Sequence, residues 1–215
     1  MNPKTHTAIR PLPSTWQWKK LGKICRILNG STPSTSNPEY WDGDILWATP
    51  TDIGRLQEIE LCDTERKITK AGLDSCSVTL LPVGTVLMTS RAPVGNLAIA
   101  GKEMCTNQGF KSFIPNQGLY NRYLYFLLIF YVPVFQRISH GNTFTEITKE
   151  MLRDFYLPVP VDENEQREIA TRLEAQMVEI QRLSWAAERQ IEAISALSNT
   201  ALRDIFGGFS PPAEE

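Results

Sequence analysis

The chain has 215 residues, a net charge of −2 at pH 7, 42% hydrophobic residues and 21% charged residues. These values are typical of a folded globular protein and exclude a disordered or fibrous chain. The one long apolar run, residues 123–135, contains Pro133 and is too short to span a bilayer, so we expect a buried helix there.

Cysteine usage and the first residues bear on compartment and on metal binding. The four cysteines, Cys25, Cys62, Cys76 and Cys105, are scattered, and no pair has the spacing of metal ligands. Residues 1–15 lack the apolar core and the cleavage pattern of a secretory signal. We therefore expect a cytoplasmic protein with free thiols, no disulfide, no metal and no cofactor.

The net charge conceals two parts of opposite sign. Residues 1–160 contain 17 Lys and Arg against 13 Asp and Glu, a net +4, whereas residues 161–215 contain 5 against 11, a net −6. The cations that precede the first acid, Glu39, are Lys4, Arg10, Lys19, Lys20, Lys23 and Arg26. Such a basic surface attracts phosphate, although an ordinary solvated surface gives the same pattern.

We divide the chain into a globular domain of residues 1–160, a long helix within residues 161–209 and a flexible tail of residues 210–215. In the domain, residues 1–11 are predicted to be a flexible leader. Trp16, Trp18 and Leu21 then follow at alternating or helical spacing. We favour a role for them as core anchors over base stacking. Residues 24–28 predict a strand, residues 29–38 a polar loop, and residues 40–47 a turn that leads into a strand.

The rest of the domain also alternates between short elements and loops. Residues 53–68 are typical of a peripheral hairpin, and residues 69–73 of a short helix. Residues 77–89 predict two strand segments broken by a turn at 82–84, and residues 98–100 predict another strand. Polar loops at 90–96, 106–111 and 139–144 and a short helix at 147–155 complete the domain. The fold class that follows is α+β: a mixed domain followed by one long α-helix that pairs as an antiparallel coiled coil.

Polar loops and early lysines supply the candidate nucleic-acid contacts. Asn and Gln side chains suit adenine, Arg suits guanine, and hydroxyl groups suit phosphate oxygens. The same residue types are ordinary loop formers, so each alone is a weak signal. The predicted DNA-binding residues are Lys19, Lys20, Ser31, Thr32, Ser90, Arg91, Asn107, Gln108, Lys111, Asn142 and Thr143.

One short motif suggests a different activity. Residues 37–40, Asn-Pro-Glu-Tyr, resemble the Asn/Asp-Pro-Pro-aromatic motif of amino-methyltransferases, but Glu39 replaces the second proline. The sequence also contains no glycine-rich turn for a methyl donor and no carboxylate cluster of nuclease type. We therefore predict that the chain is not an enzyme.

The most informative stretch is the predicted helix at the end of the chain. It follows the extended segment Leu157-Pro158-Val159-Pro160, begins with Asp162 as N-cap and Glu165 three residues later, and stops at Gly207-Gly208. At about 1.5 Å per residue such a helix is about 66 Å long. One reading is a helix packed against its own domain, but the length favours pairing with another helix.

Apolar residues mark the face of this helix that needs a partner. They recur in steps of three and four with a mean of 3.6, the period of a nearly straight helix. The predicted dimerisation residues are Ile169, Leu173, Met177, Ile180, Leu183, Ala187, Ile191, Ile194, Leu197, Ala201 and Ile205. The other faces carry charges such as Glu179, Arg182, Glu188 and Arg189.

In order and together, several motifs resemble the specificity subunit of type I restriction–modification systems. The similarity covers residues 12 to about 209, although each motif alone is weak. The motifs are Leu12-Pro13, Trp16 and Leu21-Gly22; Gly30-Ser31-Thr32-Pro33; Gly43-Asp44-Ile45 and Trp47; the LPVGTVL of residues 81–87; Ser90-Arg91-Ala92 and Gly95; Thr106-Asn107-Gln108; and Pro158, Pro160, Glu165-Gln166, Ile169-Ala170 and Leu173.

This resemblance implies a non-catalytic subunit. Its domain would recognise double-stranded DNA, and its helix would be the spacer that carries a methyltransferase subunit and, through it, the restriction subunit. Family members hold two domain–helix repeats, whereas this sequence contains one, so it is either a natural half-subunit or a truncated chain. A single copy leaves an unpaired apolar stripe, for which an antiparallel dimer is the closed solution. Two-fold symmetry then predicts an inverted-repeat target.

Other interpretations stay open at this stage. Pairing with a different half-subunit would also cover the stripe. A coiled-coil scaffold that does not read DNA is the alternative function.

Overall fold

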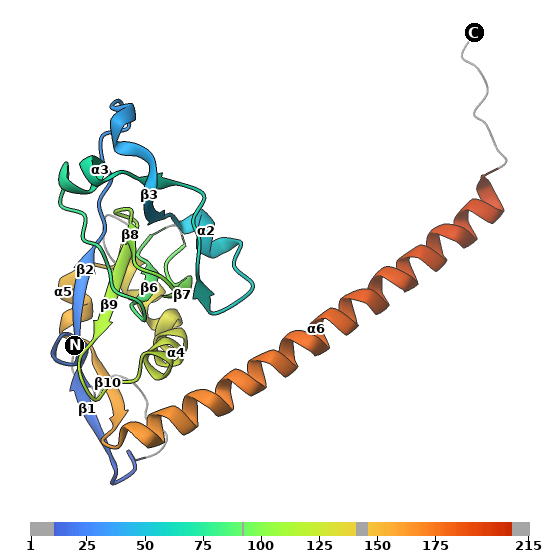
Figure 1. Ribbon diagram of the computed structural model, residues 1–215. Coiled ribbons are helices and arrows are strands. Elements are labelled where there is room, and N and C mark those ends of the chain that lie inside the picture. The colour runs from blue at the N-terminus through green and yellow to red at the C-terminus, as the bar shows by residue number, and fades with distance from the viewer. Residues whose placement is uncertain (1–10, 92, 141–145, 208–215) are drawn as a thin grey trace. The chain divides into compact units, whose positions relative to one another are not determined.

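A computed structural model of the chain describes residues 11–91, 93–140 and 146–207 (Figure 1). Residues 1–10 of the predicted leader, the tail of residues 210–215 and most of the loop at 139–144 therefore lie outside the described residues. The strands are β1 (Trp16–Lys20), β2 (Cys25–Asn29), β3 (Trp41–Ala48), β4 (Glu60–Leu61), β5 (Lys67–Ile68), β6 (Val86–Thr89), β7 (Leu97–Ala100), β8 (Met104–Thr106), β9 (Phe110–Pro115) and β10 (Tyr156–Pro160). The helices are α1 (Leu21–Ile24), the 3₁₀ turn η2 (Pro38–Tyr40), α2 (Pro50–Gly54), α3 (Lys70–Asp74), α4 (Asn121–His140), α5 (Lys149–Arg153) and α6 (Glu163–Phe206).

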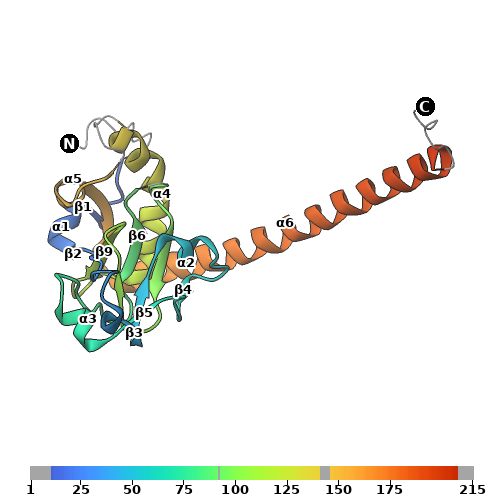
Figure 2. The same ribbon diagram turned by 90° about the horizontal axis from the view of Figure 1, so that it is seen from above.

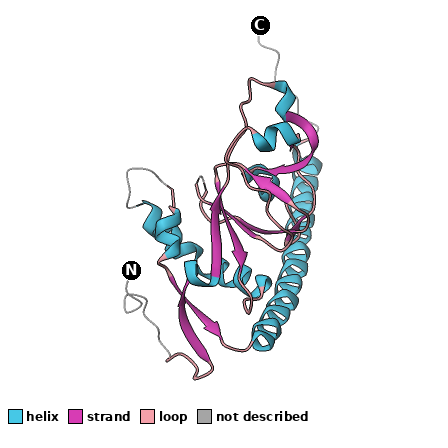
Figure 3. Cartoon of the chain, turned by 60° about the vertical axis from the view of Figure 1, so that its left-hand side comes forward, coloured by secondary structure: helices cyan, strands magenta, loops and turns pink. Residues whose placement is uncertain are grey.

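Within the described residues the strands form three small sheets, drawn in magenta in Figure 3. One has the order β2-β9-β6-β7-β4, with only β4 and β7 parallel. In the second, β3 lies between β5, antiparallel to it, and β8, parallel to it. The third is the ribbon of β1 and β10, which pair antiparallel from Trp16↔Pro160 to Lys20↔Tyr156. The α+β class predicted from the sequence is confirmed.

The five-stranded sheet is buried on both sides: one core cluster joins it to β3, β8 and α2, and α4 also packs against it. Strand β6 is buried along its whole length, and Phe110 and Phe113 of β9 are fully buried beside it. Helix α4 packs against β6 and β7, and Figure 2 shows it beside β6. The helix predicted over residues 123–135 is therefore confirmed, but only one face of it is buried. Phe130, on the outer face, is 71% exposed.

Two predicted elements differ in the structure. Residues 53–68 do not form a hairpin, because β4 pairs with β7 in one sheet while β5 pairs with β3 in another. Residues 77–89 contain one strand, not two. Before β6 only Leu81 makes a bridge, to Met104, and the chain then turns through Pro82 and through Gly84, whose φ is +85°. Proline has no N–H for a strand ladder, and positive φ suits glycine, so pairing resumes only at Val86.

The caps explain where α6 begins and ends. Asp162 Oδ1 accepts a hydrogen bond from Asn164 N at 2.9 Å, as its N-cap position predicts. Glu165 accepts a hydrogen bond from the Trp16 indole N at 2.7 Å, so it holds β1 next to the helix start. At the other end Gly207 N donates to Arg203 O at 2.8 Å. The chain divides into two compact units between Ala170 and Thr171, so the first turns of α6 belong to the globular unit.

Candidate nucleic-acid interface

Two polar loops distant in the sequence meet beside the ends of β2 and β8. Ser31 N donates to Thr106 O at 2.9 Å, and Thr32 Oγ1 donates to Gln108 Oε1. A Cβ at Gly30 would lie 1.9 Å from Asn107 O, so only glycine permits this approach. The structure therefore brings together Ser31, Thr32, Asn107 and Gln108, four of the predicted DNA-binding residues.

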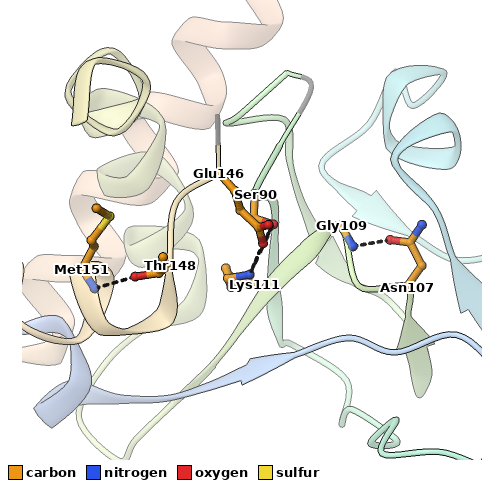
Figure 4. Close-up of polar contacts among 7 residues, drawn as sticks. All are labelled: Ser90, Asn107, Gly109, Lys111, Glu146, Thr148 and Met151. Carbon is orange, nitrogen blue, oxygen red and sulfur yellow. Dashed lines mark hydrogen bonds and ion pairs between the residues drawn. The ribbon is translucent and has the colours of Figure 1, made fainter. Parts of the chain in front are cut away.

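The loop between β8 and β9 is fixed by its own side chain. Asn107 N donates to Ala48 O at 3.0 Å, and Asn107 Oδ1 accepts from Gly109 N at 2.9 Å (Figure 4). This Asx-type turn leaves Gln108 exposed at the tip of the loop. The loop is therefore held in shape before any ligand binds.

A third loop joins this group through Ser90. Ser90 N donates to Gly109 O at 2.7 Å, and Ile147 N donates to Ser90 O at 3.0 Å. Arg91 follows with an exposed side chain. We call the loop cluster of residues 30–32, 90–91, 106–109 and 146 the polar rim. Ser90, Thr106 and Gly109 are buried within it, whereas Arg91 and Gln108 are exposed.

Lys111 lies beneath the polar rim. It belongs to strand β9 rather than to the predicted loop, and its side chain is only 5% exposed. Its Nζ lies 2.9 Å from Glu146 Oε1 and 3.3 Å from Ser90 Oγ (Figure 4). The buried ammonium group of Lys111 therefore faces a partly exposed carboxylate.

Glu146 is the member of this group that the sequence analysis missed. Burial acts to raise its pKa, but the hydrogen bond and charge of Lys111, together with Ser90 and Arg91, hold the pKa below the usual range. No sequence signal pointed to this residue, because Lys111 and Ser90 lie 35 and 56 residues before it.

The other predicted DNA-binding residues lie elsewhere. Lys19 and Lys20 belong to β1, at the far end of the globular unit from β3 and β8 in Figure 1. Lys20 forms an ion pair with Asp154 at 2.9 Å; the hydrogen bond raises the pKa of Lys20 and lowers that of Asp154. Asn142 and Thr143 lie outside the described residues. Among the described residues no helix has the length and apolarity of a membrane span, and no three metal-ligating side chains form a cluster.

Gln166, in the first turns of α6, is fully buried and ties the helix to the domain. Its Oε1 accepts from Tyr120 N at 2.8 Å, and its Nε2 donates to Gly118 O at 3.0 Å and to Pro160 O at 3.1 Å. All of its hydrogen-bonding groups thus serve the junction between domain and helix, and Arg167 stacks 4.2 Å from the Tyr120 ring centroid.

The apolar stripe of α6 is exposed beyond the first turns. Ile169 and Leu173 are half-buried, and Ala187 is exposed. The long side chains after them range from 49% exposed at Met177 to 71% at Leu197; the others are Ile180, Leu183, Ile191, Ile194 and Ile205. The side chain of Ala201 is not among those described. Such a row of exposed aliphatic side chains marks an interaction surface.

A second apolar pair on α6 was missed from the sequence. Val178 is 70% exposed and Trp185 is 55% exposed. Because an α-helix advances about 100° per residue, both residues lie on the face opposite the stripe. The outer face therefore carries more than charge.

A family model described as the type I restriction modification DNA specificity domain matches residues 13–183. The chain belongs to this family. Over 169 residues it is 42% identical to the type I restriction enzyme MjaIX specificity subunit of Methanocaldococcus jannaschii, which covers 78% of this chain and 39% of the relative. It is 27% identical over 204 residues to the EcoR124I/EcoR124II specificity subunit of Escherichia coli, covering 91% of this chain and 49% of the relative.

Solved structures similar to this specificity-domain chain also come from type I restriction–modification proteins. A chain of a type I restriction–modification system, from a study of complex assembly and conformational transition, matches with a TM-score of 0.75 and 25% identity. The match covers 92% of this chain and 47% of the other. The HsdS subunit from Thermoanaerobacter tengcongensis matches with a TM-score of 0.66 and 25% identity, covering 84% and 42%. The chain thus spans less than half the length of these relatives.

Proposed function

We propose that this specificity-domain chain is the non-catalytic DNA-recognition subunit of a type I restriction–modification complex, and that its polar rim reads one half of a bipartite DNA site. The observation that carries the proposal is the meeting of three separate loops in one preformed polar surface. The family to which the chain belongs supports it, since that family is described by DNA specificity. A scaffold that does not read DNA has no comparable support.

The chemistry of the rim suits base and phosphate contacts. Gln108 and Arg91 are exposed at loop positions, and their amide and guanidinium groups match the major-groove edges of adenine and guanine. Ser31 and Thr32 offer hydroxyl groups at the same surface. Because the backbones of these loops bind one another, little ordering entropy remains to be lost on binding DNA.

The division of labour follows the chain. Residues 1–160 supply recognition, and residues 161–209 supply spacing and assembly. Gln166 and Glu165 tie the first turns of α6 to the globular unit. Catalysis belongs to partner subunits. A DNA target and free thiols, among them the buried Cys25 and Cys105, fit a cytoplasmic protein.

We further propose that a second copy of the chain, running antiparallel, covers the apolar stripe. The spacing of the stripe is symmetric about Ala187. Ile169 and Ile205 are each 18 residues from Ala187, and Ile180 and Ile194 are each 7 residues from it. A two-fold axis at Ala187 would place each member of such a pair against the other.

Other residues fit the same register. Leu183 and Ile191 are each 4 residues from Ala187, so they also face each other across the axis. Gln176 and Ser198, polar residues on the stripe, are each 11 residues from it, so polar meets polar. A small alanine at the centre allows close approach of the two helices. This self-complementarity favours the homodimer over pairing with a different half-subunit.

The outer face of α6 remains free for the methyltransferase subunit in this arrangement. Trp185 and Val178 provide an apolar anchor there, and Glu179 and Arg182 form an ion pair at 2.9 Å beside it. Tryptophan is enriched among the residues that dominate binding energy at protein interfaces. The restriction subunit would join through the methyltransferase.

The decisive experiment is selection from a randomised duplex library by the chain purified with its methyltransferase subunit. The proposal predicts enrichment of two identical half-sites in inverted orientation, separated by a spacer of fixed length. Sequencing of methylated adenines in the host should return the same motif. Enrichment of no motif would contradict DNA recognition, and a motif with two unlike halves would contradict the homodimer.

A further inference from the structure

Glu146 has two carboxylate oxygens in different surroundings. Oε1 accepts from Lys111 Nζ at 2.9 Å and from Ser90 Oγ at 3.2 Å. Oε2 has no partner within the described ranges, and the side chain is 35% exposed at the polar rim. Lys111 and Ser90 thus fix one oxygen (Figure 4), and the other is left without a partner among the described residues.

The need of buried Lys111 for a counter-ion explains the position of Glu146 Oε1, but it does not explain why Oε2 has no partner among the described residues. Lys111 needs a counter-ion because an unpaired buried ammonium is costly. A carboxylate placed fully inside the domain would meet that need. Instead the Glu146 side chain extends from Lys111 towards the polar rim. Its backbone forms an isolated antiparallel β-bridge with Arg91, whose side chain is exposed.

The charge of Glu146 also restricts what it can contact. The Lys111 ammonium, with Ser90 and Arg91, keeps the group ionised at neutral pH, so both oxygens only accept hydrogen bonds. A phosphate group would be repelled, since it too is an anion that lacks a donor. At a DNA surface, the partner left for such an oxygen is an amino group on a base edge.

We propose that Glu146 is a specificity-determining residue whose free oxygen accepts a hydrogen bond from the N4 amino group of cytosine in the major groove. Adenine also has an amino group there, but its neighbouring N7 is an acceptor that would face the carboxylate unfavourably. Lys111 and Ser90 are positioning residues, because they fix the carboxylate and do not contact the base. This inference rests on the proposed function, since it assumes that the polar rim reads DNA.

The test compares base preferences of the wild type with those of Glu146→Gln. Glutamine keeps an oxygen for Lys111 and nearly the same volume, so the variant should fold. With that oxygen held by Lys111, the outward group is the amide nitrogen, which donates hydrogen bonds and cannot accept one from cytosine N4. Preference for cytosine at one position of each half-site should therefore fall at least about fivefold. Preferences at the other positions should stay unchanged. Removal of the negative charge should also leave binding to non-specific DNA equal or stronger.

Glu103→Gln is the matched control, because Glu103 is an exposed carboxylate in the turn between β7 and β8, outside the polar rim. It should leave every base preference unchanged. Three outcomes would overturn the inference: an unchanged preference profile in Glu146→Gln, an equal loss at all positions, or the same change in Glu103→Gln. A wild type that enriches no motif would instead refute the proposed function, on which the inference depends.

Discussion

Two charges placed in the apolar stripe should separate the proposed dimer. Ile180 and Ile191 are 56% and 64% exposed in the single chain, so each has more than half of its surface left to bury. Full burial of such a side chain is worth about 1.5–3 kcal/mol, which gives about 1–2 kcal/mol for the exposed part. Each residue occurs twice in a dimer, so the four side chains together contribute about 4–8 kcal/mol.

The double variant Ile180→Glu with Ile191→Glu should therefore bind its own copy at least about a thousandfold more weakly, since about 1.4 kcal/mol corresponds to a factor of ten. Sedimentation equilibrium over a wide concentration range measures this directly. Near-ultraviolet circular dichroism should show an unchanged domain, because the globular unit ends at Ala170.

Val178→Glu is the matched control for this experiment. It introduces the same charge on the same helix at a side chain that is 70% exposed, but on the face opposite the stripe. It should leave the dimer intact and weaken only the binding of the methyltransferase subunit. A wild type that is monomeric at every concentration, or a dimer that survives the double variant, would refute the reasoning. Equal dissociation by Val178→Glu would refute the choice of face.

Four further predictions concern the globular unit. Gln166→Ala leaves three backbone groups without their partner, one of them in a buried hydrogen bond and two in part-buried ones, and should lower the free energy of unfolding by about 2–4 kcal/mol, measured in urea. Gln117→Ala, at an exposed position, should change it little. Gly30→Ala places a Cβ 1.9 Å from Asn107 O and should push the loops at 30 and 107 apart. DNA binding measured in gel shifts should therefore weaken. Arg91→Ala should weaken DNA binding by about 1–3 kcal/mol if Arg91 contacts a base, and an unchanged affinity would show that it does not. The pKa of Glu146 is lowered in the folded state, so its stabilising contribution is present above the unfolded pKa of about 4.3 and is lost as pH falls through the folded pKa. The free energy of unfolding of a Glu146→Gln variant should therefore fall less with acid than that of the wild type.

The long helix illustrates what can be predicted from local sequence. Its start at Asp162, its end at Gly207 and its stripe follow from capping chemistry and from a 3.6-residue period, both of which act within a few residues along the chain. The α+β class and several short elements, such as α3 and β7, were predicted on the same grounds. The ordered motifs led to the predicted family, and the family-model match over residues 13–183 confirms that family.

The sheet pairings and the polar rim depend instead on contacts between distant residues. Nothing near β4 or β5 in the sequence shows that they join different sheets, because pairing is decided by edges supplied by β7 and β3. In the same way Lys111 was predicted as a loop residue, yet the register of β9 with β6 turns it inward. Local patterns do not record which strand edge a segment will meet.

The sequence by itself determined a mixed domain, a capped helix with one symmetric apolar stripe, and the family. Only the tertiary structure decided which loop residues share a surface, because the loops at 30, 90 and 107 meet through backbone hydrogen bonds between separate strand ends. It also separated Lys19 and Lys20 from that surface and introduced Glu146 into it. Proximity of this kind arises when the chain closes on itself, so no window of neighbouring residues contains it.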